Sequence, residues 1–125
     1  MRDPPSGDDL LQCARKALRD EVLPSLPGEQ RHTLLMVMNA MSIAERQLRY
    51  GQGPADEELT AIARLLGTNC DELATGNRRL CDLIRQGEAD PGQPQRAALL
   101  AHLRAVGRQR LLESNPKLLN EGNAP

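Results

Sequence analysis

Aromatic side chains are almost absent from this chain of 125 residues, which has no Phe and no Trp and a single tyrosine, Tyr50. Modules that bind single-stranded nucleic acid stack bases on several aromatic side chains, so the composition argues against that class of protein. A core without Phe or Trp is filled by Leu, Ile, Val, Met and Ala. Side chains of that size let helices approach closely, which favours a helical bundle over a β-sandwich.

The chain also has no excess of positive or negative charge, since its formal net charge is −1. No overall electrostatic field therefore attracts nucleic acid or an anionic membrane, and we expect neither as a partner. No apolar run approaches the roughly 18 residues of a membrane-spanning helix. The start of the chain, Met1–Pro5, has no hydrophobic stretch, so we predict no signal peptide and a cytoplasmic protein.

Motifs of recognised chemistry are missing as well. Cys13, Cys70 and Cys81 form no CxxC pair, and we expect buried thiols in a reducing compartment. His32 and His102 are isolated, so the helical HExxH metal site is absent. No glycine-rich phosphate loop and no GxSxG nucleophile turn occurs. We therefore predict no metal, no cofactor and no catalytic residue.

Five segments keep the 3.6-residue period of an amphipathic helix and are separated by Pro and Gly. We expect helices from Ser6 to the break at Leu23–Pro24, and over 29–50, 55–66, 69–86 and 94–114. Ser6 and Thr68 are the predicted N-caps, and Gly67 is a predicted C-terminal stop. The prediction is an all-α, single-domain, up-and-down bundle of five helices over residues 1–125, with disordered tails at 1–6 and 120–125.

The 29–50 helix carries the richest pattern. Leu34, Val37, Met41, Ala44 and Leu48 share one apolar face. His32, Asn39 and Arg46 recur every seven residues and form a polar row. Further apolar residues extend beyond the predicted face: Leu35, Met36, Met38 and Ile43. Two interpretations remain open, either a central helix covered on several sides or a binding surface for a partner, which includes a second copy of the chain.

Polar residues at apolar helix positions give the remaining signal. Asn77 lies on the apolar face of the fourth helix, where it either joins two helices or contacts a ligand. Glu21 lies near the end of the first helix, where the dipole disfavours an acid, and Arg46 or Arg110 would relieve it. If these groups meet, they form an inter-helix binding pocket with six members: Glu21, His32, Asn39, Arg46, Asn77 and Arg110.

Several segments carry a family resemblance: LRDEVLPSLPG at 18–28, NRRLCDLIRQGE at 77–88, and LLAHLRA with RLLESNPKLL within 99–119. Together with the spacing of His32, Asn39, Ile43 and Glu45–Arg46, they resemble a bacterial family of small helical proteins that carry a domain of unknown function. The resemblance implies genes beside acyl-CoA dehydrogenases and kinases of the aminoglycoside-phosphotransferase type. It implies no activity.

Two functions follow as hypotheses. The first is a non-catalytic accessory protein for an acyl-CoA dehydrogenase and a phosphotransferase-like kinase, bound through the broad apolar surface of the 29–50 helix. The second is a small-molecule binder of the acyl-CoA type, or an enzyme, that uses the polar inter-helix pocket. A homodimer through the 29–50 helix is compatible with the first.

Overall fold

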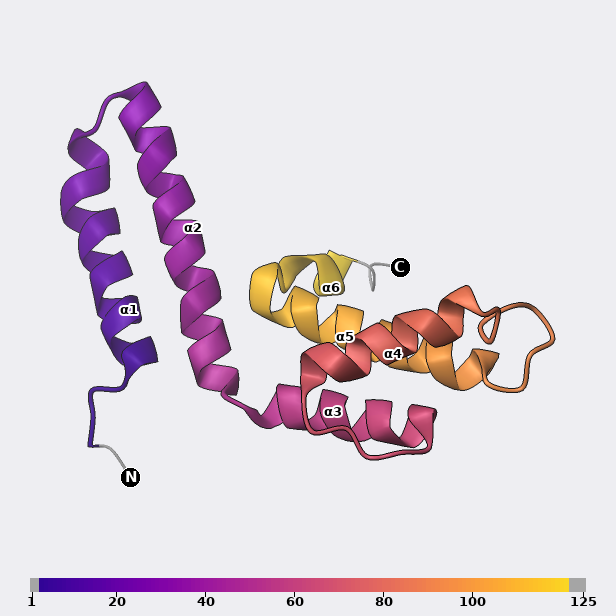
Figure 1. The fold of residues 1–125 in the computed structure, drawn as a ribbon. Coiled ribbons are helices and arrows are strands. Elements are labelled where there is room, and N and C mark those ends of the chain that lie inside the picture. The colour runs from indigo at the N-terminus through magenta and orange to yellow at the C-terminus, as the bar shows by residue number, and fades with distance from the viewer. Residues whose placement is uncertain (1–2, 122–125) are drawn as a thin grey trace. The chain divides into compact units, whose positions relative to one another are not determined.

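A computed structural model describes residues 3–121 of the chain, and every element it contains there is helical (Figure 1). The α-helices are α1 (Gly7–Ala17), α2 (Gly28–Tyr50), α3 (Gly53–Leu66), α4 (Leu73–Arg85), α5 (Arg96–Ser114) and α6 (Lys117–Glu121). The all-α prediction is confirmed. The described residues contain six α-helices where the sequence predicted five, because Lys117–Glu121 forms a short helix beyond Pro116.

The helix ends show how local sequence fixed the elements. Ser6 caps α1, and its backbone N–H donates to the Asp9 carboxylate at 3.1 Å. The Ser6 hydroxyl, 2.7 Å from Asp9 Oδ2, lowers the pKa of the Asp9 carboxyl. Gly67 ends α3 with φ +66°, the left-handed conformation that favours glycine. These two predicted caps are confirmed.

The predicted tails lie partly outside the described residues. Residues 1–2 and 122–125 fall there, whereas Ser6 is the cap of α1 and residues 120–121 belong to α6.

The break predicted at Leu23–Pro24 is present, and two short turns that are not α-helical lead from α1 toward α2. After α1 the backbone widens into a π-helical turn over Leu18–Val22 and tightens into a 3₁₀ turn over Leu23–Ser25. Pro24 has no N–H to donate, so the α-helical hydrogen-bond pattern ends there. Arg31 of α2 then donates to the Leu23 carbonyl at 3.2 Å, which ties the turn to the following helix.

The fourth helix begins at Leu73, four residues later than the Asn69 start predicted from Thr68. Glu72 is its N-cap in an extended conformation, and Thr75 donates its hydroxyl to the Glu72 carboxylate at 3.0 Å. The preceding loop instead brings the Cys70 thiol to the Glu72 carbonyl at 3.2 Å. This loop conformation removes Asn69–Asp71 from the helix.

The chain divides into two compact units, which are described separately. The first contains residues 1–51 and 111–125, and the second contains residues 52–110. In the first unit, α1 and α2 run side by side as a hairpin (Figure 1), with Leu23 and Met38 as its buried apolar residues. The buried face of α2 is turned toward Met38 and Glu45, whereas Val37 and Leu48 of the predicted face are exposed.

The second unit packs α3, α4 and α5 around a core of Ile62, Leu80 and Leu99, one residue from each helix. Gly76 of α4 is buried against this core. A Cβ at position 76 would lie 2.9 Å from Ile62 Cγ2 and 3.0 Å from Cys70 Sγ. Glycine is therefore required for the close approach of α4 to α3.

We expect Gly76→Ala to lower the free energy of unfolding by about 1–2 kcal/mol, because fully buried Ile62 has no room to move away. Chemical denaturation followed by circular dichroism measures the change. Gly107→Ala is the matched control, since Gly107 lies inside α5 with open space around it. The control should gain up to about 1 kcal/mol from helix propensity. A gain in both variants would contradict the close-packing argument.

Candidate functional site

A buried carboxylate organises the helical hairpin of the first unit. Glu45 of α2 is only 5% exposed. Its Oε2 lies 2.9 Å from Arg15 Nη2 of α1, and its Oε1 accepts a hydrogen bond from Arg49 at 3.0 Å. Arg49 also reaches Asp8 at the start of α1, at 3.5 Å. Four charged groups thus join the two helices.

The Glu45–Arg15 contact is an ion pair rather than an aligned hydrogen bond. Glu45 Oε2 and Arg15 Nε are buried, and neither makes a hydrogen bond of good geometry within the described part of the chain. The attraction within such a buried pair offsets little of the free energy lost when the two charges leave water. The pair therefore determines which helix faces meet more than it stabilises the hairpin. Glu45 was noted in the sequence only as part of the family resemblance. The sequence signal for its burial was its position seven residues after Met38, on the same side of the helix.

Arg46 binds the end of another helix. Its guanidinium donates to the carbonyl oxygens of Glu113 and Ser114, the last residues of α5, and to the Ser42 hydroxyl at 3.0 Å. Cationic side chains stabilise the unpaired carbonyls at a helix C-terminus. Arg46, predicted as a ligand contact, therefore has a structural role in the first unit.

A second carboxylate joins the helices of the second unit. Glu58 of α3 accepts a hydrogen bond from the Asn77 amide of α4 at 3.2 Å. Arg110 Nη2 of α5 lies 4.0 Å from the other Glu58 oxygen. Asn77 and Arg110, which the sequence predicted as binding residues, thus share Glu58 as their partner, and the Glu58 side chain is only 12% exposed. Sequence reasoning missed this role, because Glu58 lies in the first turn of the predicted 55–66 helix, where the helix dipole alone accounts for an acid.

The six predicted binding residues are not brought together as one pocket within either unit. Glu21, His32 and Asn39 are exposed in the first unit, where Arg46 caps α5. Asn77 and Arg110 belong to the second unit and contact Glu58. Arg110 pairs with Glu58, whereas the sequence offered Arg46 or Arg110 as the partner of Glu21.

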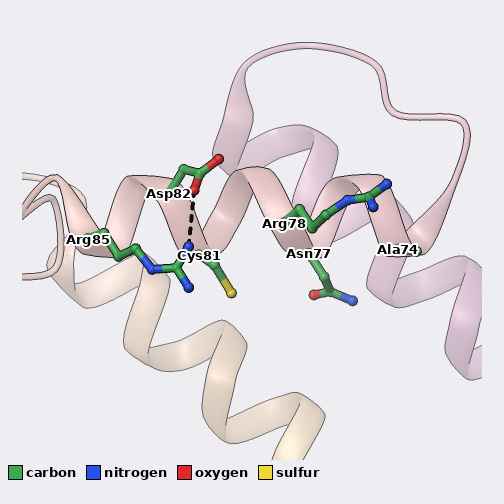
Figure 2. A pocket seen from close by; sticks show the side chains of 6 residues that line it. All are labelled: Ala74, Asn77, Arg78, Cys81, Asp82 and Arg85. Atoms are coloured by element: carbon green, nitrogen blue, oxygen red, sulfur yellow. Dashed lines mark hydrogen bonds and ion pairs between the residues drawn. The ribbon is translucent and has the colours of Figure 1, made fainter.

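A hollow of about 320 Å³ lies along α4 in the second unit. Figure 2 shows its six lining residues, with Asn77 and Cys81 pointing to the same side of the helix. The others are Ala74, Arg78, Asp82 and Arg85. Arg85 pairs with Asp82 at 3.3 Å, and Arg78 donates to Thr75 at 3.2 Å. Two cations beside an amide suit an anionic or amide-bearing ligand.

The cysteines differ from the buried thiols predicted. Cys13 and Cys81 are exposed, Cys70 is half-buried, and all three are free. Among residues 3–121, no group of three or more His, Cys, Asp or Glu side chains could hold a metal ion. None of the helices over the same range is long and apolar enough to cross a membrane.

The hairpin exposes large apolar side chains at two places. The middle patch consists of Leu35, Met36 and Val37 of α2, which are 45%, 58% and 47% exposed. The end patch consists of Leu10, Leu48 and Tyr50. Leu48 lies 3.1 Å from the position that a Cβ on Gly7 would take, so it covers the first turn of α1, close to Leu10 along the chain.

The other two predicted interface residues lie elsewhere. Met38 is buried between the helices of the hairpin, and Ile43 is half-buried. A charge at Met38 would therefore disrupt the hairpin core, so this position cannot report on an exposed surface.

Comparison with known proteins gives one match. Residues 24–118 fit the family model of a domain of unknown function, DUF6285. The chain belongs to this family. The DUF6285 match begins at Pro24, so it includes α2 but leaves out α1, its partner in the hairpin. No curated protein and no solved structure matches the chain.

We expect Glu45→Ala to lower the free energy of unfolding by about 2 kcal/mol, because it leaves the Arg15 guanidinium without its carboxylate. The partial exposure of both arginines keeps the loss below that of a fully buried pair. Thermal and urea denaturation would measure it. Exposed Glu29, replaced by Ala, is the control and should change stability by less than about 0.5 kcal/mol. Equal effects at both positions would show that Glu45 does not join the helices.

Proposed function

We propose that this DUF6285 protein is a non-catalytic accessory protein that binds another protein through its α1–α2 hairpin. The candidate partners are the enzymes implied by the family resemblance, an acyl-CoA dehydrogenase and a phosphotransferase-like kinase. The proposal takes the protein to be cytoplasmic.

The observation that carries the proposal is the exposure of large apolar side chains on one small unit. Among the residues that the structure describes, nine large apolar side chains are exposed; seven of them lie on the hairpin and include both patches. Large apolar side chains that gather on the exposed surface of one small element are typical of a protein-binding site. Leu10 and Leu48 are more than half exposed although they belong to helices whose opposite sides are packed.

The polar groups of the hairpin support the same function. Glu45, Arg15 and Arg49 hold α1 and α2 together, and Arg46 holds the end of α5. These side chains are engaged in internal contacts, whereas the large apolar side chains of the two patches point outward. A rigid two-helix element with an apolar surface matches the way amphipathic helices bind grooves in other proteins.

The end patch provides the test. The tagged protein, purified from its source organism, should retain an acyl-CoA dehydrogenase or a kinase of the phosphotransferase type in stoichiometric amount, identified by mass spectrometry. Leu10→Asp combined with Leu48→Asp should reduce that amount at least about tenfold, since charges at an apolar contact are left without partners.

Leu103→Asp serves as the control, because Leu103 is exposed on α5 in the other unit. Circular dichroism should show equal helix content in all three proteins. Retention of the enzyme by the double variant, or its loss from the control, would contradict binding through the end patch. Absence of both enzymes from the wild-type sample would contradict the proposed partners.

A second candidate function rests on the hollow along α4. There, Arg78 and Arg85 offer positive charge and Asn77 an amide, a combination that suits the phosphate and amide groups of an acyl-CoA-type ligand. We expect an acyl-CoA to bind in isothermal titration calorimetry, and Arg78→Ala with Arg85→Ala to weaken binding about tenfold or more. Arg104→Ala, at an exposed position on α5, should leave the affinity unchanged. Equal affinity in all variants would remove the hollow as the site.

A further inference from the structure

The chain passes between the two compact units at two places, and the first of these is a glycine joint. Only Gly51 and Gln52 lie between the end of α2 at Tyr50 and the start of α3 at Gly53. Gly51 has φ +63° and ψ −148°, a combination that essentially only glycine adopts. Within the described part of the chain, no atom beyond the neighbouring residues lies within 4 Å of a Cβ placed on Gly51 or Gly53. Packed side chains therefore do not hold the backbone at this joint.

The second passage lies inside a continuous helix. α5 belongs to the second unit as far as Arg110, and to the first unit from Leu111 to its end at Ser114. A helix is stiff over a turn, because each backbone N–H bonds to the carbonyl four residues earlier. Rotation at Gly51–Gln52 therefore requires either that α5 bends or that its last turn leaves the first unit.

Arg46 of α2 holds that last turn in the first unit. Its Nε donates to the Glu113 carbonyl at 2.5 Å, and its Nη2 donates to the Ser114 carbonyl at 3.2 Å. The neighbouring Gln47 donates its side-chain amide to the Glu113 carboxylate at 3.4 Å. These acceptors lie at a helix end, where water satisfies the same carbonyls when no side chain does. Opening this contact therefore exchanges hydrogen bonds within the protein for hydrogen bonds to water, and the net free energy of that exchange is modest.

We infer that Arg46 is the latch of a hinge formed by Gly51 and Gln52. With the latch closed, α5 ties the two units together. With the latch open, the last turn of α5 moves with the second unit and the hairpin turns about Gly51–Gln52. The open state is a minor population of the free protein, on the order of 1–10%. The inference goes beyond the proposed function and does not depend on it.

The hinge borders the surface that is proposed to bind another protein. Tyr50 of the end patch lies one helical turn after Arg46, on the same side of α2, and directly precedes Gly51. A protein bound at the end patch therefore lies beside both the latch and the joint. It shifts the hinge by the factor by which it binds one of the two states more tightly.

Two native cysteines provide the positions for a test. Cys13 is exposed in the first unit and Cys81 is exposed in the second. In the full chain with Cys70→Ser, spin labels on these two thiols report the distance between the units by double electron–electron resonance. The protein with native Arg46 should give one main, narrow distance. Arg46→Ala should broaden the distribution about twofold or more, because the hairpin is then joined to the second unit through Gly51–Gln52.

Arg31→Ala is the matched control. Arg31 also lies on α2 and donates to a backbone carbonyl, that of Leu23, but this contact lies within the hairpin. Its distance distribution should equal that of the protein with native Arg46. Arg46→Gln guards against a folding defect, because it keeps a polar side chain at this half-buried position and removes only the charged fork that reaches two carbonyls. It should broaden the distribution as well, with the helix content unchanged by circular dichroism.

Three results would overturn the inference. The first is an unchanged distribution in both Arg46 variants, and the second is equal broadening in Arg31→Ala. The third is a distribution for native Arg46 that is already as broad as that of Arg46→Ala, since α5 would then tie the units no more tightly than the joint does. None of these measurements involves the partner enzyme, so failure of the hinge and failure of the proposed function are distinguishable.

Discussion

The ion pair between Glu45 and Arg15 decides which side of α2 meets α1, and the surface of the hairpin follows from that choice. Only one side of α2 can face its neighbour. Because a carboxylate is buried at this contact, that side includes Glu45 and also Met38, which lies two helical turns earlier on the same side of α2. The apolar residues on the other sides of α2 then remain exposed. A more conventional apolar contact through Val37 and Leu48 would have buried the residues that are now exposed.

The second unit uses a carboxylate differently. Its core is apolar, with Ile62, Leu80 and Leu99 packed tightly enough that Gly76 admits no side chain. Glu58 lies at the edge of this core and takes an amide from α4 and a guanidinium from α5. Here the packing positions the helices and the polar contacts satisfy the groups at the rim. Both units thus use polar side chains mainly to hold helices together.

This use of polar groups shapes the functional argument. Asn77 and Arg46, which stood out in the sequence as polar groups on helices, are occupied by internal contacts. The hairpin also exposes two groups of large apolar side chains, and apolar helical surfaces bind proteins more readily than they perform chemistry. The hollow along α4 differs in being lined by polar side chains, although Asn77, Arg78 and Arg85 each also contact a neighbouring side chain.

The sequence by itself determined the helices and most of their ends. Pro24, Gly51, Gly67 and Asn115–Pro116 act on the backbone within a few residues, and Ser6 caps α1 through a neighbour three positions away. Signals of this kind need no knowledge of the rest of the chain. The start of α4 escaped prediction because a loop contact of Cys70 with Glu72 outweighed the capping signal at Thr68.

The tertiary structure decided which polar residues meet. Arg46 binds carbonyls 67 and 68 positions away along the chain, and Asn77 binds Glu58 across 19. Helical periodicity places a residue on a face of its own helix but contains no information about the neighbouring helix. The rotation of α2 toward Glu45, and with it the exposure of the middle patch, depends on such a neighbour. The physical reason is that the pairing of two helices depends on the balance between packing and desolvation across their contact. The sequence of one helix alone does not determine that balance.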